Sequence, residues 1–213
     1  MKLYDVHTHG KASATDIKNV IFSWDDPVSR GYYSVGAHPL FYEWTRDLYA
    51  QLEKLCRAKT AVAVGECGFD KRSPMSFSEQ SELFLTHVRI SEELKKPLVI
   101  HCVGCFNELT VVRREVMPFQ PWLVHGFRKN PQLAASLAQQ GFYFSLGKEG
   151  IRREGVLETI PMDRLFFETD EDTELSIEQV YREAAAVIGV DMEYLAARVE
   201  ENFDRVFLSA GEP

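Results

Sequence analysis

Two histidines stand two positions apart near the start of the chain, in the segment Val6–Gly10, "VHTHG". Side chains two apart on an extended strand point to the same face, about 6.6 Å apart along the chain. His7 and His9 could therefore hold one metal ion together. The motif alone is a weak indication, because a chain with six histidines can contain such a pair by chance. Its meaning depends on which other residues the fold brings near it.

Five of the eight apolar runs in the chain lead into side chains that could bind a metal. These are His7 and His9 after residues 2–6, Glu66 after 61–65, His101 after 97–100, His125 after 121–124, and Asp170, beyond Glu168 and Thr169, after 163–167. A single histidine after such a run is more often a hydrogen-bonded core residue, but five coincident positions favour a metal site. Asp5 is expected to orient a ligand imidazole. His87 falls within a predicted helix and is assigned no chemistry.

Four imidazoles and two carboxylates suit Zn²⁺, Mn²⁺ or Fe²⁺ better than Ca²⁺ or an all-oxygen Mg²⁺ cage. Six ligands exceed the needs of one tetrahedral zinc ion. We therefore expect two divalent ions, of Zn, Mn, Mg or Fe, with Glu66 as the bridge between them and an activated water at the site.

The arrangement of the apolar runs predicts a parallel sheet built from βα units. The eight runs are 2–6, 19–22, 31–35, 61–65, 97–100, 121–124, 142–145 and 163–167. Eight strands close an (α/β)₈ TIM barrel, in which all carboxyl ends of the strands meet on the face that carries the active site. The short connection from Gly10 to Gly31 predicts abbreviated first units and so a distorted barrel.

Helical periodicity fills most of the intervals between these runs. Helices are predicted over 45–58, 76–96 and 130–141, and a closing pair over 176–190 and 191–207. We expect residues 1–213 to form a single domain.

The composition is that of a globular chain, with a net charge of −8 and a pI near 5.3. Such a charge repels polyanions at long range, so nucleic acid is neither excluded nor supported. No apolar run is long enough for a membrane span, and the N-terminus has no secretory pattern, so we expect a cytoplasmic location. The four cysteines are predicted to be free thiols, including the C-x-x-C pair Cys102 and Cys105.

At these residues the chain resembles the TatD family of metal-dependent hydrolases, within the amidohydrolase-like barrel superfamily. The likeness lies in "DVHTHG", "VGAHP", "AVGECGFD", "QSELFLTHVRISEELKKPLVIH", "LVHGF", "FFETD" and the "ENFDRVF" tail. The "GECGFD" and "ETD" elements are the most specific.

The resemblance implies a distorted TIM barrel with a binuclear site that hydrolyses phosphodiester bonds in DNA. By position, one ion would take His7, His9, Glu66 and Asp170, and the other Glu66, His101 and His125. Asp170 would hold or deprotonate the attacking water. His38 would face the substrate and contact a phosphate or leaving group.

Two departures from the family pattern bear on the substrate. Val103 stands where members commonly carry an Arg that contacts phosphate; Arg128 and Lys148 could compensate, or could be solvated charges. Acidic residues, namely Glu171, Asp172 and Glu174, follow Asp170 and would repel a phosphate backbone.

Two other functions stay open at this point. One is an amidohydrolase-type hydrolase of C–N or ester bonds in a small molecule, for which the usual carboxylated Lys bridge has no candidate. The other is a metal-binding or partner-binding barrel without catalysis. The oligomeric state is open.

Overall fold

The computed structural model describes residues 1–10, 13–25, 31–42 and 45–209, and eight parallel strands lie in this part of the chain. They are β1 (Asp5–Thr8), β2 (Asp16–Ile21), β3 (Tyr32–Gly36), β4 (Ala61–Asp70), β5 (Leu98–Val103), β6 (Trp122–Val124), β7 (Phe142–Leu146) and β8 (Leu165–Phe167). Their order in the sheet is their order in the chain, and a Thr8–Asp170 bridge joins the two ends. The predicted distorted TIM barrel is confirmed.

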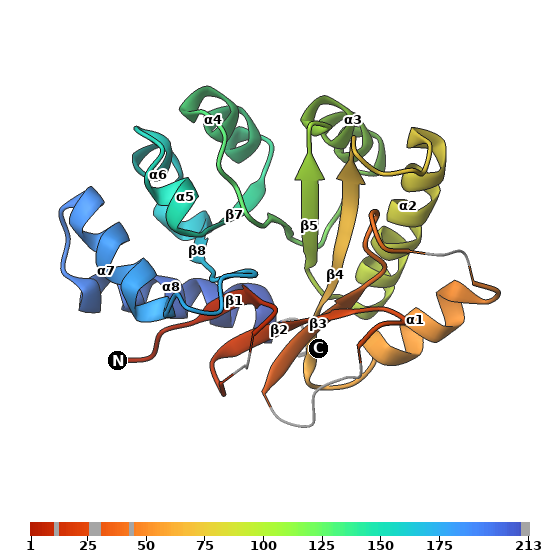
Figure 1. Cartoon of the computed structure of the whole chain (residues 1–213), viewed down its shortest axis with the longest axis horizontal. Helices are drawn as coiled ribbons and strands as arrows, with labels where there is room; N and C mark the ends of the chain where they lie inside the picture. Colours follow the sequence, from red (N-terminus) through yellow and green to blue (C-terminus); the bar gives the residue numbers. More distant parts are fainter. Residues whose placement is uncertain (11–12, 26–30, 43–44, 210–213) are drawn as a thin grey trace.

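The helices lie around the strands (Figure 1). They are α1 (Leu48–Cys56), α2 (Phe77–Leu94), α3 (Phe106–Val116), α4 (Pro131–Gln139), α5 (Lys148–Ile151), α6 (Val156–Thr159), α7 (Ile177–Ile188) and α8 (Met192–Phe203), followed by a π-helical turn, Asp204–Leu208. Ser76 caps α2 in a capping box, and the Asn130 side chain accepts from Leu133 N at the start of α4. The sequence analysis found both starts but missed α3.

Several strands extend further toward their carboxyl ends than the apolar runs predicted. His7 lies inside β1, Glu66 inside β4 and His101 inside β5, whereas the analysis placed each of them after a strand. The predicted strand ends were wrong because polar side chains that face one another across a barrel rim can form hydrogen bonds with one another. A strand at such a rim does not have to end at its first polar residue.

Close backbone contact between β4 and β5 sets the position of Glu66. A Cβ on Gly65 would lie 2.2 Å from Val99 O, and one on Gly68 would lie 2.1 Å from His101 O. Both glycines have left-handed φ values, +130° and +141°, that favour glycine. The pairing register also shifts between Val64 and Cys67, which is a β-bulge. The bulge re-aims the intervening Glu66 side chain.

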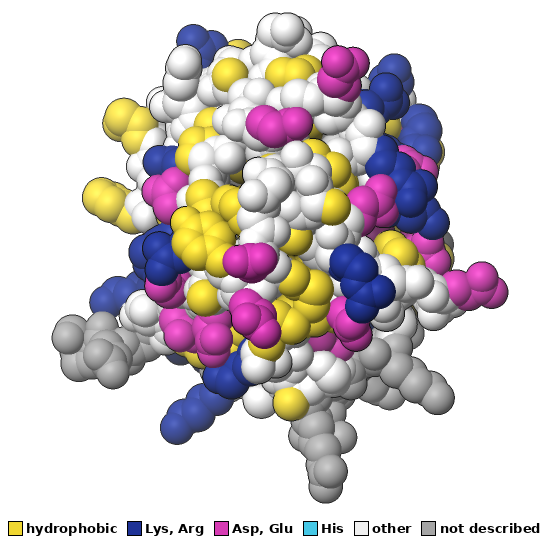
Figure 2. Space-filling view, turned by 90° about the vertical axis from the view of Figure 1, so that its left-hand side faces the viewer, with side chains coloured by type: hydrophobic (Ala, Val, Ile, Leu, Met, Phe, Trp, Pro, Cys, Tyr) yellow, Lys and Arg dark blue, Asp and Glu magenta, His cyan; other side chains and the backbone are white. Residues whose placement is uncertain are grey.

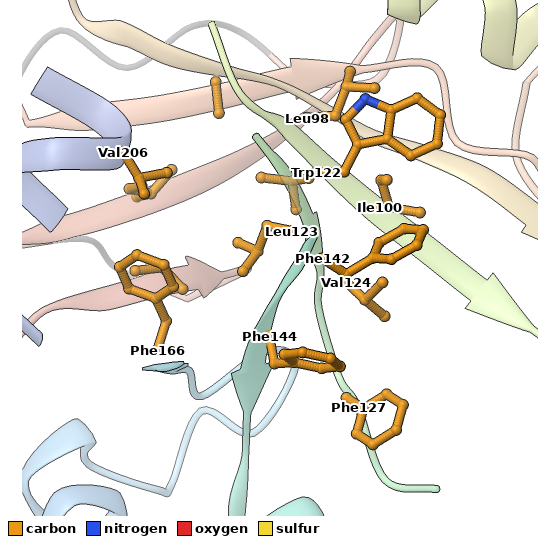
Figure 3. Close-up of a cluster of buried hydrophobic side chains, with 14 of the residues drawn as sticks. Leu98, Ile100, Trp122, Leu123, Val124, Phe127, Phe142, Phe144, Phe166 and Val206 are labelled. Atoms are coloured by element: carbon orange, nitrogen blue, oxygen red, sulfur yellow. The ribbon is translucent and has the colours of Figure 1, made fainter. Parts of the chain in front are cut away.

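Large apolar side chains pack between the strands and the helices around them; for example, Trp122 contacts Phe84 of α2. Trp122, Phe142 and Phe144 on β6 and β7 are fully buried, and Figure 3 shows them beside Leu98 and Ile100 of β5. Their packing holds β5, β6 and β7 in fixed register. Among the described residues, no helix is long and apolar enough to cross a membrane.

The outer face that carries α7 has mixed side chains. Figure 2 shows acidic, basic and hydrophobic groups interspersed on this side of the molecule. A surface of this kind gives no directed field for a charged partner.

His87 lies within α2, as predicted, and supports the backbone next to His38. Its ring is fully buried; Nδ1 lies 2.7 Å from Leu83 O, and Nε2 accepts a hydrogen bond of 2.9 Å from Ala37 N. Burial lowers the pKa of His87 to about 4. The neutral ring is needed here because protonated Nε2 could not accept from Ala37.

The difference in stability between wild type and His87→Gln is expected to depend on pH. His87 has a lower pKa folded than unfolded, so its contribution is complete above about pH 6.5 and is lost as pH falls toward about 4, by roughly 3 kcal/mol. The glutamine of the variant does not titrate, so the variant does not lose stability in this way. Urea unfolding of both proteins between these pH values measures the difference, and parallel curves would contradict the assignment.

Candidate metal centre

The predicted ligands converge at the carboxyl rim of the barrel. His7 and His9 come from β1, Glu66 from β4, His101 from β5, His125 follows β6, and Asp170 follows β8. His38, which follows β3, joins them. The rim therefore brings together residues that are up to 163 positions apart, as the parallel topology predicts.

One carboxylate oxygen of Glu66 faces three imidazoles. Glu66 Oε1 lies 2.7 Å from His125 Nε2, 2.8 Å from His101 Nδ1 and 3.2 Å from His38 Nε2. His38, Glu66 and His101 offer ligand atoms within 4.8 Å of one another. This side of Glu66 is one group of possible donors to a cation.

The other oxygen of Glu66 faces the H-x-H pair. Glu66 Oε2 lies 3.4 Å from His7 Nε2 and 3.8 Å from His9 Nε2. Asp170 Oδ1 lies 3.6 Å and 3.7 Å from the same two nitrogens. His7, His9 and Glu66 form a second group of donors within 4.8 Å, and His7, His125 and Asp170 form a third. His125 therefore lies between the two sides of the site.

The neighbouring imidazoles keep Glu66 ionised. Burial by itself raises the pKa of Glu66, but the charge of His125 and hydrogen bonds from His101, His125 and His38 outweigh it and hold that pKa well below its usual range. Burial opposes charge on His125 too, but Glu66 and Glu168 raise its pKa well above the ordinary value. Burial and the neighbouring His7 lower the pKa of His9.

The residues at the rim fit divalent cations. Both ring nitrogens of His7 are buried and have no hydrogen-bond partner among the described residues. A buried imidazole rarely lacks hydrogen-bond partners, because each buried polar atom without a partner costs about 1–3 kcal/mol of stability. Coordination by Nε2, which faces Glu66 and Asp170, would satisfy one of them. The mixed nitrogen and oxygen donor set suits the transition ions named above.

Asn19 on β2 is a site residue that the sequence analysis missed. Its Nδ2 donates to Glu66 Oε2 at 3.0 Å, and its Oδ1 accepts from Glu66 N at 3.2 Å. Nδ2 also lies 3.3 Å from His9 Nε2. An Asn inside an apolar run gives no sequence signal except that it is polar at a position whose neighbours are buried.

Asp70 and Arg72 extend the site behind His101. Asp70 Oδ2 lies 2.9 Å from His101 Nε2, and the guanidinium of Arg72 donates to both Asp70 oxygens. Burial opposes the charge of Asp70, but these two partners hold its pKa below its usual range. Asp70 stands in the quoted "GECGFD" motif, which was the available signal.

The role expected for Asp5 is corrected. Asp5 contacts no imidazole among the described residues; it accepts from His7 N at 3.3 Å, Thr169 N at 3.2 Å and Thr169 Oγ1 at 2.6 Å. It thus holds the main chain on both sides of the β1–β8 junction. The prediction was wrong about the partner of Asp5, because two main-chain N–H groups and the Thr169 hydroxyl already donate to its carboxylate oxygens. Burial raises the pKa of Asp5 to about 7.

A cavity of about 370 Å³ opens over the cluster. Its lining includes His9, His38, Glu66, His101, His125 and Asp170, with Arg72, Arg128 and Lys129. Arg128 is paired with Glu149 at 2.7 Å on the surface. Lys148 lines an adjoining cavity of about 230 Å³ instead and is paired with Asp172 at 2.7 Å. Arg128 thus lines both this main cavity over the cluster and the adjoining one, whereas Lys148 lines only the adjoining one.

Cys102 and Cys105 of the C-x-x-C motif form no disulfide with each other. Cys102 and Cys105 are free, buried thiols, and burial raises the pKa of each. Thiols that stay protonated are poor nucleophiles and poor metal ligands. The prediction of free thiols is confirmed.

Two proteins with similar sequences are named as a hydrolase and a nuclease. The metal-dependent hydrolase YcfH of Escherichia coli, itself uncharacterised, is 28% identical over 194 residues, which cover 82% of this chain and 73% of that one. The 3′–5′ ssDNA/RNA exonuclease TatD of Cronobacter sakazakii is 26% identical over 211 residues, 84% of this chain and 78% of that one.

The fold is also shared with a solved structure. YjjV, a TatD homologue of E. coli, superposes with a TM-score of 0.79 at 20% identity, over 91% of this chain and 86% of that one. The family model for TatD-related DNases matches residues 6–208. The chain therefore belongs to the TatD-related DNase family and is a metal-dependent hydrolase.

Proposed function

We propose that residues 1–213 act as one barrel domain that hydrolyses phosphodiester bonds of nucleic acid with two divalent ions. The observation that carries this proposal is the orientation of Glu66. Its Oε1 faces His38, His101 and His125, and its Oε2 faces the H-x-H pair. A carboxylate with donors on both sides is suited to bridge two ions.

The ions are assigned by position from the family resemblance. One would be held by His7, His9, Glu66 and Asp170, and the other by Glu66, His101 and His125. Among the donor groups within 4.8 Å, His7, His9 and Glu66 support the first set. For the second set, His101 groups with Glu66 and His38, and His125 Nε2 lies 2.7 Å from Glu66 Oε1. When bound, such ions lower the pKa of a water and polarise the oxygen of the scissile bond.

The chain's own residues supply the proton transfer and the substrate contact. The Asp170 side chain is 40% exposed and lines the cavity, so it can accept a proton from the attacking water. His38 lines the cavity as well, and its Nε2 can contact a phosphate oxygen or the leaving group.

Two observations favour a phosphodiester substrate. The relatives include a protein named as an ssDNA/RNA exonuclease. The cavity wall also carries three cationic side chains, Arg72, Arg128 and Lys129, although Val103 provides no charge there. Of the acids expected to repel phosphate, Asp172 is paired with Lys148, which reduces that repulsion.

Replacement of the bridging carboxylate is expected to remove both metal binding and turnover. Wild type should hold about two divalent ions per chain, and Glu66→Gln fewer, with hydrolysis lower by roughly 10³-fold or more. Metal analysis and an exonuclease assay with Mn²⁺, Mg²⁺ or Zn²⁺ measure the two effects. Glu115→Gln, at an exposed carboxylate on α3, is the control. Unchanged turnover in Glu66→Gln would refute the proposal.

Loss of the Asn19 side chain is expected to weaken the site without removing a ligand. Asn19→Ala frees the Glu66 carboxylate from a partner that orients it, which should cost about 10–100-fold in metal affinity. Calorimetric titration with Mn²⁺ measures this, with Asn107→Ala on the exposed side of α3 as control. Equal affinities of the two variants would show that Asn19 does not position Glu66.

Replacements of Arg128 and Lys148, the two cationic residues named as substrate contacts, are expected to differ in their effect on KM. Arg128→Ala should raise KM several-fold because Arg128 lines the main cavity, whereas Lys148→Ala should leave KM nearly unchanged. Steady-state kinetics on one oligonucleotide compare the two variants. An equal or larger effect of Lys148→Ala would mean that the substrate enters through the adjoining cavity.

A further inference from the structure

Three aromatic rings form a row that runs outward from the metal centre; we call Trp24, Phe41 and His38 the aromatic ladder. The His38 and Phe41 ring centroids are 4.8 Å apart with a 26° interplanar angle, and Phe41 and Trp24 are 5.1 Å apart at 39°. The inner end is fixed by His38 Nε2, 3.2 Å from Glu66. The ladder therefore connects the reacting centre to the surface.

The outer two rings are exposed, although their backbones are held in place. Trp24 is 63% exposed and Phe41 38%, whereas His38 is 4% exposed. Trp24 N donates to Ile21 O at 3.0 Å, and Phe41 N donates to His38 O at 3.2 Å. Large exposed rings on bonded turns, next to a cavity, are typical of binding surfaces and not of core packing.

Cationic side chains lie in the wall of the cavity and not over the two outer rings of the ladder. Arg72, Arg128 and Lys129 line the cavity that Phe41 also lines. No Lys or Arg side chain in the described ranges lies over the Trp24 or Phe41 ring. The cavity wall thus carries Lys129 and the ion-paired Arg72 and Arg128, which can contact an anionic group, and the ladder offers two exposed aromatic rings beside it.

We infer that Trp24 and Phe41 form a stacking subsite for the base of a nucleotide next to the hydrolysed phosphodiester in single-stranded nucleic acid. A nucleotide combines an anionic group with a flat ring at short distance, which is the combination that cavity and ladder present. Bases inside a duplex stack on each other and leave no face free, so the subsite favours a single strand. This inference rests on the proposed function for its choice of ligand.

Binding to metal-free protein tests the subsite separately from catalysis. The probes are a fluorescein-labelled oligodeoxythymidine, the same strand with abasic residues, and the same strand annealed to its complement, measured by fluorescence anisotropy. Trp24→Ala and Phe41→Ala should each weaken binding of the single strand about 10-fold and leave binding of the abasic strand unchanged. Trp24→Phe should restore most of the affinity, because it keeps a stacking face.

Phe119→Ala is the matched control, since Phe119 is 93% exposed and precedes β6 at the opposite end of the barrel. Thermal unfolding checks that each variant folds. Unchanged affinity of both ladder variants, or an equal loss with the abasic strand, would overturn base stacking. Duplex binding as tight as single-strand binding would overturn the preference for a single strand.

The two proposals fail in different ways. If the strand binds through the ladder but no added metal yields hydrolysis, the proposed function is wrong and the subsite stands. If hydrolysis occurs and the ladder variants bind and cleave like wild type, the subsite is wrong and the proposed function stands.

Discussion

The burial of one carboxylate is the constraint on which the rest of the site depends. Glu66 is 3% exposed, and a carboxylate removed from water costs several kcal/mol unless charge and hydrogen bonds replace its hydration. The chain meets this cost with five imidazoles and the Asn19 amide, which reach Glu66 from β1, β2, β3, β5 and β6 or the residues just after them. The same imidazoles are the candidate donors to a cation, so the groups that satisfy Glu66 in this structure are also those of the proposed site.

The same rim closes the barrel. Asp170 N donates to His7 O, and His9 N donates to Asp170 O, both at 2.9 Å, so the pairing that joins β8 to β1 runs through candidate metal ligands. Asp5 and Thr169 brace this junction from beneath. Binding of a cation by these candidate ligands would therefore be coupled to barrel closure, because a shift of either strand would move the donor atoms.

Some parts of the site followed from the sequence because they depend on topology alone. Parallel strands of a barrel put their carboxyl ends on one face whatever their exact length, so the convergence of His7, Glu66 and His101 survived errors in the predicted strand ends. Other parts depend on contacts between distant residues. Asn19 meets the cluster only across neighbouring strands, and no local pattern marks such a partner. Asp70 stands in the quoted motif, but its contact with His101 also depends on the pairing of β4 with β5.

By itself, the sequence determined the number and order of the strands and the kind of donor atoms at their ends, while the preference for transition ions stays a prediction. These follow from local polarity patterns and from the chemistry of imidazole and carboxylate. The tertiary structure decided how Glu66 divides its two oxygens, what Asp5 holds, and how Trp24 comes to lie against Phe41. The physical reason is that a β-bulge, a close glycine contact and a turn after a strand set these orientations, and each depends on the packing of neighbouring strands.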